Sequence, residues 1–361
     1  MRILILTKRQ YTNKDLLDDR FGRIREIPLV LSRHGHDVRG LCLSYITKEP
    51  ELRHDGSVLW ESIDAGTFKF IGLGNYIKRA YELAKQADII IAFSDSFYGI
   101  IAYYLSKRNG IPFVFDLMDN FEYFFVAKLP FFKQLFHRAV LKAHAVICVS
   151  HGLKQLVSNY NRHETVFVVE NAVRTDLFKP LNRSVCRHMF GLPDKATLVG
   201  TAGALHPNRG IESLFSAWQM LTRVHPKLHL VLAGPKTADV KIPQDERVHY
   251  HGVIPYEKVP FFLNALDVAI VCNSLNAFGR FCFPQKAREI MACNLPIVAA
   301  AVPALQGLLS DHPEWLYVPD DPRNLASVLK NRLTDRRTNY GRILTWEDAG
   351  KDIENILQKI A

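Results

Sequence analysis

Residues 87–93 read Ala-Asp-Ile-Ile-Ile-Ala-Phe, a short apolar run of the kind found in strands that a parallel sheet buries on both faces. Residues 96–109 have the pattern of a helix, which Gly110 closes, and residues 112–117 form the next apolar run. A strand, a helix and a second strand joined by crossovers of this length predict a parallel sheet.

The same alternation continues in both directions and restarts after Asn171. Further strands are expected at residues 2–7, 36–43, 146–149 and 165–169, and then at 197–201, 229–233, 247–252, 268–271 and 297–301. Helices are expected at 23–34, 211–221 and 346–360. This pattern predicts an α/β protein with two doubly wound parallel-sheet domains. We place the domains at residues 1–175 and 176–342, followed by a C-terminal segment at 343–361.

Composition supports two domains and excludes several classes. A chain of 361 residues exceeds what one core usually supports. The six cysteines form no CxxC pair, so we expect no metal site. The apolar run after Met1 is too short for a signal peptide, and Pro296 and Pro303 break the longest run, so we expect a cytoplasmic protein. The net charge of +10 favours anionic partners without choosing among them.

The stretch 283–296, Phe-Pro-Gln-Lys-Ala-Arg-Glu-Ile-Met-Ala-Cys-Asn-Leu-Pro, predicts a helix N-terminus that faces an anion. Pro284 suits the first helical position, and Asn294 suits a left-handed cap. Lys286 lies in the first turn, where a cation is unfavourable unless an anion is bound there. Glu289 can accept two hydrogen bonds from a vicinal diol such as ribose. A solvated lysine and glutamate on an ordinary helix is an equally good interpretation of these residues alone.

Residues 200–212 read Gly-Thr-Ala-Gly-Ala-Leu-His-Pro-Asn-Arg-Gly-Ile-Glu, a strand end followed by a glycine-containing loop that opens a helix. The spacing excludes both the GxGxxG and the Walker motifs. Arg209 in this loop can reach a diphosphate with two parallel hydrogen bonds.

Together these stretches resemble the retaining family-four glycosyltransferases of the GT-B fold. Gly203 and Gly210 match the family's Gly-x₅-Lys/Arg-Gly loop, and residues 283–296 match its Phe-Pro-x-Lys-x-x-Glu-x-Met-Ala-x-x-x-Pro helix. Supporting matches occur at residues 33–38, 150, 170–174, 178 and 232–235. The resemblance covers nearly the whole chain.

The resemblance implies two Rossmann-like domains that face a central cleft, with the acceptor in the first and the nucleotide sugar in the second. It also implies that the C-terminal helix, within residues 343–361, crosses back to the first domain. Arg209 and Lys286 would hold the donor diphosphate, and Glu289 the ribose hydroxyls. The remaining donor-site residues would be Gly203, Pro284, Gln285 and His206, although His206 is expected to be structural more than ligand-binding. Asp119 would be catalytic. No cofactor or metal would be needed, and the donor would be a UDP- or GDP-sugar.

Some positions depart from the family pattern. A subgroup has a glutamate eight residues before Glu289, where this chain has Phe281. Met118 replaces the histidine that many members have before Asp119, and the Gly-Gly loop after the first strand is missing. These departures keep two alternatives open: a GT-B sugar-nucleotide epimerase and an inactive glycosyltransferase-like partner.

Two basic segments bear on the acceptor, which we expect to be a glycan or a lipid-linked molecule of surface polysaccharide or glycolipid biosynthesis. Arg20, Arg23 and Arg25 suit an anionic acceptor or form a solvated basic face. Residues 129–142 are basic, aromatic and amphipathic. They suit either peripheral contact with an anionic membrane, at the inner face of the plasma membrane, or packing on the first sheet. A nucleic-acid partner is not expected, because the stretch 121–142 is too hydrophobic for a solvated groove.

Overall fold

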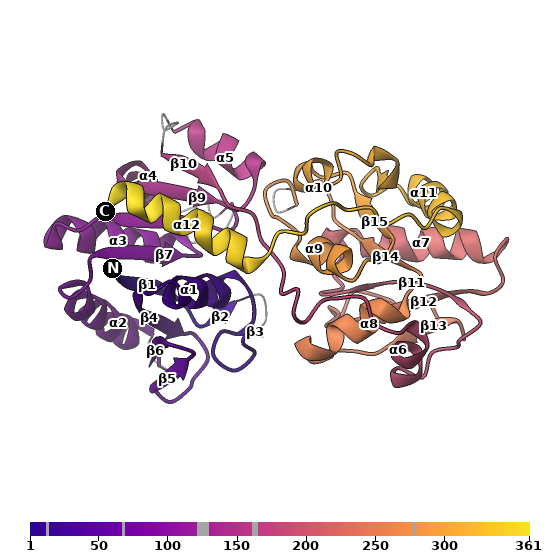
Figure 1. Ribbon diagram of the computed structural model, residues 1–361, viewed down its shortest axis with the longest axis horizontal. Helices are drawn as coiled ribbons and strands as arrows, with labels where there is room; N and C mark the ends of the chain where they lie inside the picture. The colour runs from indigo at the N-terminus through magenta and orange to yellow at the C-terminus, as the bar shows by residue number, and fades with distance from the viewer. Residues whose placement is uncertain (12–13, 67–68, 121–129, 161–164, 277–278) are drawn as a thin grey trace. The chain divides into compact units, whose positions relative to one another are not determined.

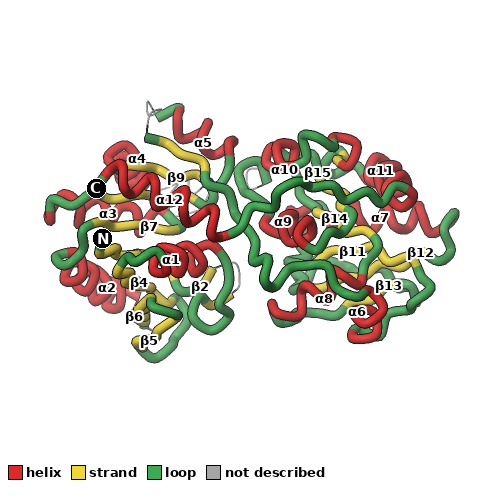
Figure 2. Tube along the Cα trace, viewed as in Figure 1, coloured by secondary structure: helices red, strands yellow, loops and turns green. Residues whose placement is uncertain are grey.

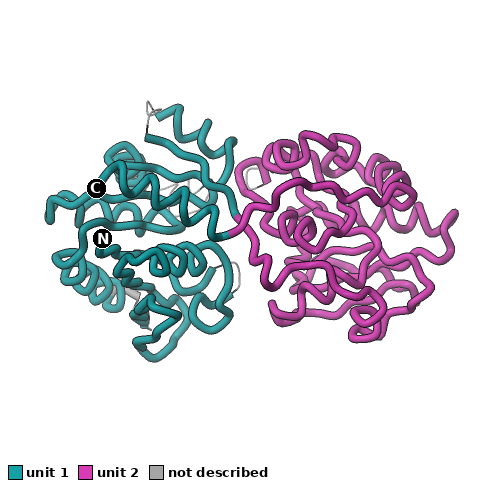
Figure 3. Tube along the Cα trace, in the orientation of Figure 1, with its two compact units in different colours: residues 1–171, 346–361 teal, residues 172–345 magenta. Residues whose placement is uncertain are grey.

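The computed structural model describes residues 1–11, 14–66, 69–120, 130–160, 165–276 and 279–361. It divides into two compact units (Figure 3). Unit 1 comprises Met1–Asn171 and Trp346–Ala361, and unit 2 comprises Ala172–Thr345. The sequence-based boundaries lay after residues 175 and 342, a few residues from these.

Unit 1 contains an 8-stranded sheet in the order β10-β9-β8-β7-β1-β4-β6-β5. Its strands are β1 (Arg2–Lys8), β4 (Asp37–Ser44), β5 (Glu51–Asp55), β6 (Val58–Asp64), β7 (Ile89–Phe93), β8 (Phe113–Leu117), β9 (Ala145–Cys148) and β10 (Val166–Val168), with a separate pair β2 (Gln10–Tyr11) and β3 (Lys14–Asp15). Its helices are α1 (Arg23–Arg33), α2 (Lys69–Ala84), α3 (Ser96–Asn109), α4 (Pro130–Lys142), α5 (His151–Ser158) and α12 (Trp346–Ile360).

Unit 2 contains a 6-stranded sheet in the order β13-β12-β11-β14-β15-β16. Its strands are β11 (Thr197–Ala202), β12 (Leu228–Ala233), β13 (Val248–Tyr250), β14 (Val268–Val271), β15 (Ile297–Ala300) and β16 (Leu316–Tyr317). Its helices are α6 (Arg183–Met189), α7 (Ile211–Thr222), α8 (Val259–Ala265), α9 (Gln285–Ala292), α10 (Pro303–Leu308) and α11 (Pro322–Thr334), with short 3₁₀ turns η3 (Pro207–Arg209), η4 (Tyr256–Lys258) and η5 (Pro313–Trp315).

Both sheets are doubly wound, which confirms the predicted fold class (Figures 1 and 2). Among the described strands of the two large sheets, every pair is parallel except β5 with β6. In each unit the chain first builds outward from one strand, β1 or β11. It then returns to that strand's other side as β7 or β14. The strand order therefore reverses between β1 and β7 and between β11 and β14, where open α/β sheets bind ligands.

The arginine cluster at the start of α1 is largely occupied by internal ion pairs, and for Arg23 and Arg25 both interpretations of the sequence, an anionic-acceptor site and a solvated basic face, are wrong. The guanidinium of Arg23 is 1% exposed and pairs with Asp116 at 2.8 Å. It also donates to the backbone oxygen of Val169 at 2.8 Å. Arg25 pairs with Asp55 at 2.5 Å and with Glu26 at 2.7 Å. The anionic-acceptor site thus loses two of its three cations, because acidic residues of the same unit already neutralise them.

Helix α12 packs against α1, although the two helices lie at opposite ends of the chain (Figure 1). The contact is close at Gly350, where an added Cβ would lie 2.3 Å from Cγ1 of the buried Val30. Beside it, Glu347 lies 2.9 Å from Arg33 and 2.5 Å from His34. Further contacts join Glu354 to His34 at 2.6 Å and to His36 at 3.0 Å. Packing and charge together therefore fix α12 within unit 1.

We expect Gly350→Ala to lower the free energy of unfolding by about 1–3 kcal/mol, because the new methyl group must displace Val30. Gly307 is the matched control, since it also lies in a helix and has nothing within 4 Å of an added Cβ. Gly307→Ala should be neutral or stabilising by about 0.5–1 kcal/mol. Urea denaturation of both variants measures the difference, and equal stabilities would contradict close packing of α12 on α1.

The ion pairs of α12 should make its docking depend on pH. Hydrogen bonds with Glu347 and then Glu354 raise the pKa of His34. A raised histidine pKa stabilises the fold at low pH, and that stabilisation is lost as the pH rises through the raised pKa. We therefore expect His34→Gln to lower the melting temperature more at about pH 6 than at about pH 9. An equal loss at both pH values would mean that His34 acts through packing alone.

Candidate functional site

Two glycine loops meet at the carboxyl edge of the unit 2 sheet, directly after β11 and β12. Gly203 and Gly234 have φ values of +126° and +124°, which side-chain-bearing residues rarely adopt. The amide of Gly203 donates to the oxygen of Ala233 at 2.9 Å. A Cβ on Gly234 would lie only 2.0 Å from the oxygen of Gly203. The loops thus pass so closely that Gly234 has no room for a side chain.

Lys286 lies directly against the first of these loops. A Cβ added to Gly203 would be 3.0 Å from the Nζ of Lys286. Burial, and after it the positive charge of Arg209, lower the pKa of Lys286 to about 8. The two cations are therefore close enough to repel each other, and a bound anion would relieve that repulsion.

Glu289 lies one turn further along α9 and is 7% exposed. Its Oε1 accepts hydrogen bonds from the hydroxyl of Tyr256 and from Nε2 of Gln285, both at 3.1 Å. Burial raises the pKa of Glu289 to about 7, and these two hydrogen bonds oppose the rise. Near neutral pH the carboxyl group therefore exchanges readily between a form that only accepts hydrogen bonds and a form that also donates one.

Helix α9 begins one residue later than the sequence predicted. Pro284 is the residue before the helix rather than its first residue, and no side chain caps the helix there. The reason is its ψ of 96°, which belongs to extended backbone. The predicted cap is confirmed at the other end. Asn294 has a φ of +52°, and the amide of Leu295 donates to the oxygen of Ile290 at 3.2 Å.

The loop that holds Arg209 forms the 3₁₀ turn η3. Nδ1 of His206 accepts a hydrogen bond from the amide of Asn208 at 3.1 Å, so this side chain caps the turn. Arg209 is half-buried at the end of the turn, and Gly210 follows with a φ of +69°. The structure thus gives His206 the structural role that the sequence favoured.

The predicted site residues fall into two groups. Gly203, His206, Arg209, Pro284, Gln285, Lys286 and Glu289 all lie in unit 2, on loops and a helix that follow β11 and β14. Asp119 lies in unit 1 after β8, half-buried, and its Oδ1 accepts from the amide of Asn120 at 2.8 Å. Phe281 is half-buried and Met118 is buried.

Sequence reasoning missed Tyr256, which lies 33 residues before its partner Glu289. It also missed Ser274, Asn276 and Asp320, which contact the Arg209 loop or each other. No local pattern identifies these residues, because their partners are brought together only by the sheet. Among the described residues, no group of three or more His, Cys, Asp and Glu could hold a metal ion. Within the same residues, no helix is long and apolar enough to span a bilayer.

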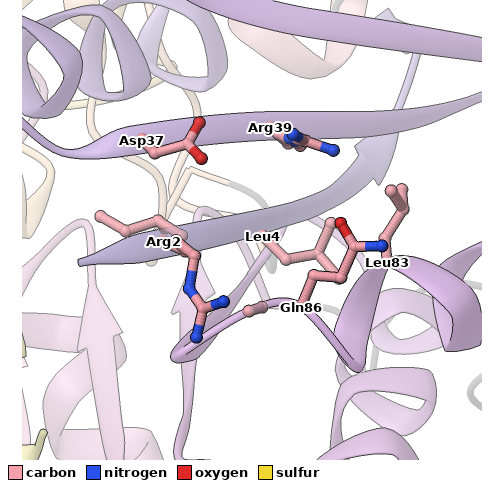
Figure 4. A pocket seen from close by; sticks show the side chains of 8 residues that line it. Arg2, Leu4, Asp37, Arg39, Leu83 and Gln86 are labelled. Carbon is pink, nitrogen blue, oxygen red and sulfur yellow. The ribbon is translucent and has the colours of Figure 1, made fainter.

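A cavity of about 320 Å³ lies elsewhere, at the amino ends of β1 and β4 in unit 1 (Figure 4). Arg2, Asp37, Arg39 and Gln86 contribute its polar lining. The guanidinium of Arg2 is already paired with Asp88 at 2.5 Å. The cavity contains none of the predicted site residues and lies at the edge of the sheet opposite to the one where parallel sheets bind ligands.

Two family models match the chain, one in each half. Residues 24–177 match the family described as Glycosyltransferase Family 4, and residues 196–335 match the one described as Glycosyl transferases group 1.

Curated relatives of the chain are also glycosyltransferases. The D-inositol 3-phosphate glycosyltransferase of Thermomonospora curvata is 27% identical over 227 residues, covering 54% of this chain and 52% of the relative. The corresponding protein of a Nocardioides species is 24% identical, with 57% and 51% covered. The chain therefore spans about half the length of these relatives.

Solved structures match over the whole chain. Sucrose-phosphate synthase from Thermosynechococcus elongatus superimposes with a TM-score of 0.79 at 17% identity, covering 100% of this chain and 99% of that one. HepE from Anabaena, in complex with UDP and glucose, gives 0.75 at 16% identity, with 99% and 100% covered. At these identities the likeness establishes the fold.

The raised pKa of Glu289 predicts a measurable pH dependence of stability. Between the ordinary value of 4.5 and about 7, the folded state keeps a proton that the unfolded state has lost. The free energy of unfolding therefore falls as the pH rises through this window. We expect Glu289→Gln to remove this part of the slope in denaturation curves, with the exposed Glu257→Gln as control. A slope unchanged in Glu289→Gln would contradict the burial of this carboxyl group.

Proposed function

The chain belongs to the glycosyltransferases of family 4 (group 1), and we propose that it transfers a sugar from a nucleoside-diphosphate donor held in unit 2. The observation that carries this proposal is the placement of Lys286 against Gly203, with Arg209 near enough to lower the lysine pKa. Two cations beside exposed backbone, at the point where the strand order reverses, suit a diphosphate.

In this proposal each residue of the site has a separate task. Arg209 and Lys286 neutralise the leaving diphosphate as its charge develops, and no metal ion or cofactor is needed for that step. Gly203 lets the phosphates approach the backbone, and the amides that follow Pro284 face them at the start of α9. Glu289, kept in place by Tyr256 and Gln285, accepts the ribose hydroxyls of a UDP- or GDP-sugar.

We place the acceptor in unit 1, with Asp119 as a catalytic residue and retention of anomeric configuration. Support comes from the corresponding point of strand reversal, between β1 and β7. Lys8 ends β1, Asp95 caps α3 just after β7, and the two side chains pair across this point at 3.5 Å. Ser94 has a φ of +77° there, and its buried hydroxyl has no hydrogen-bond partner among the described residues. Strained backbone and an unsatisfied hydroxyl are typical of binding sites.

We propose a glycan or lipid-linked acceptor of surface polysaccharide or glycolipid biosynthesis and peripheral contact with an anionic membrane on the cytoplasmic side. Helix α4 supports the contact. Its inner face packs into unit 1 through the buried Phe136 and Val140. For that face, the interpretation that this segment packs on the first sheet is therefore correct. Its outer face exposes Phe131, which is 73% accessible, together with Lys133, Arg138 and Lys142. Leu129, the first residue of the predicted segment, lies outside the described residues.

A thermal-shift panel without added metal tests the donor site. We expect one nucleoside diphosphate among UDP, GDP, ADP and TDP to raise the melting temperature, because a ligand that binds only the folded state stabilises it. Glu289→Ala should abolish the shift and Arg209→Ala should reduce it, while Arg223→Ala, which changes an exposed arginine of the same unit, should leave it unchanged.

The same variants should lose transferase activity, measured as nucleoside diphosphate released from the matching sugar donor. Removing one charged donor to the leaving group should cost on the order of 10²-fold in kcat. Full activity in Arg209→Ala or Glu289→Ala would refute the site assignment. No shift with any nucleotide would favour an inactive glycosyltransferase-like protein. The departures from the family pattern at Phe281 and Met118 would then explain the loss of activity. Release of a free altered sugar nucleotide without an acceptor would favour an epimerase.

A further inference from the structure

The loop that follows β14 holds the residues immediately before and after Arg209. On one side, Nδ2 of Asn276 donates a hydrogen bond to the backbone oxygen of Asn208 at 2.6 Å. On the other side, a Cβ added to Gly210 would lie 3.2 Å from the hydroxyl of Ser274. Both contacts cross the point where the strand order reverses, from the loop after β14 to the loop after β11.

A third segment closes the contact at Gly210. The hydroxyl of the buried Ser274 donates to Oδ1 of Asp320 at 2.8 Å. The same Oδ1 would lie 3.0 Å from a Cβ on Gly210. Asp320 has a φ of +62°, which is uncommon for a residue with a side chain. The strain of this conformation is offset by the contacts that its carboxylate makes.

We propose that Ser274, Asn276 and Asp320, which we call the loop clamp, are positioning residues that fix Arg209 for the donor diphosphate. This inference rests on the proposed function. An arginine side chain has several freely rotating bonds, so its guanidinium makes two parallel hydrogen bonds to phosphate only where its backbone is held still. The loop clamp holds the backbone before Arg209 through the hydrogen bond to Asn208 and packs close to the backbone after it at Gly210.

Asn276 offers a substitution that separates the clamp from local folding. Its Oδ1 accepts a hydrogen bond from the amide of Gly279 at 2.9 Å, within its own loop. Its Nδ2 holds Asn208 in the other loop. Asn276→Asp has the same shape and keeps an acceptor for Gly279. It loses the donor to Asn208 and sets a carboxylate oxygen against a carbonyl oxygen, so the contact with the Arg209 loop is broken.

Calorimetric titration with UDP and GDP tests the clamp. We expect Asn276→Asp to raise the Kd of the preferred nucleotide about tenfold, the effect of losing a hydrogen bond that orders a charged ligand contact. Ser274→Ala should shift the Kd in the same direction, and it provides a second variant if Asn276→Asp does not fold. Asn339→Asp, which adds the same charge at an exposed position of unit 2, should leave the Kd unchanged.

The double variant Arg209→Ala with Asn276→Asp distinguishes positioning from general destabilisation. If the clamp acts through Arg209, the double variant binds no more weakly than Arg209→Ala alone. The clamp would be overturned if the losses of affinity in the double variant were additive, or if the Kd were unchanged in both Asn276→Asp and Ser274→Ala. In either case, nucleotide binding by the unaltered protein would leave the proposed function standing. If the unaltered protein binds none of UDP, GDP, ADP and TDP, the proposed function fails and the clamp fails with it.

Discussion

The candidate site depends on one constraint, the close approach of two loops at a pair of glycines, Gly203 and Gly234. Parallel strands β11 and β12 run in register and end at the same edge, so the loops after Ala202 and Ala233 must leave the sheet side by side. Gly234 lies against the backbone of Gly203, and Lys286 lies against the other face of Gly203. A larger residue at either glycine would separate β11 from β12 or push Lys286 away. The ammonium group is therefore positioned by the sheet itself.

The electrostatics of the site follow from this crowding. Lys286 is half-buried and Glu289 is buried, and burial shifts each pKa toward the neutral form, downward for the lysine and upward for the glutamate. The attraction between the two groups opposes both shifts without cancelling them, because burial has the larger effect on each pKa, and Arg209 also repels the lysine. Groups kept at such a cost to stability are typical of binding sites, where a ligand of complementary charge recovers the energy.

The sequence predicted those features of the fold and of the candidate site that depend on residues close together in the chain. The strands and helices that the sequence predicted lie within two residues of their observed bounds, because period, glycine stops and apolar runs are local properties; β11 was expected at 197–201 and spans Thr197–Ala202. Other elements, among them β5, β6, α2 and α11, were not predicted. The left-handed Asn294 was predicted for the same reason. Long-range partners were not predictable. Arg23 is basic and near a helix start, yet its partner Asp116 lies 93 residues away. The Asn276 contact with Asn208, over 68 residues, likewise exists only after the sheet has formed.

The return of α12 to unit 1 makes that unit discontinuous in sequence, since residues 172–345 belong to unit 2. A ribosome delivers the chain from its N-terminus, so unit 1 emerges without the helix that covers α1, and unit 2 is synthesised in full before that helix appears. Until then the surface around Val30 is exposed, which is a risk for aggregation during translation. The order of folding should therefore differ from the order of synthesis, with the segment made first completing its native packing last.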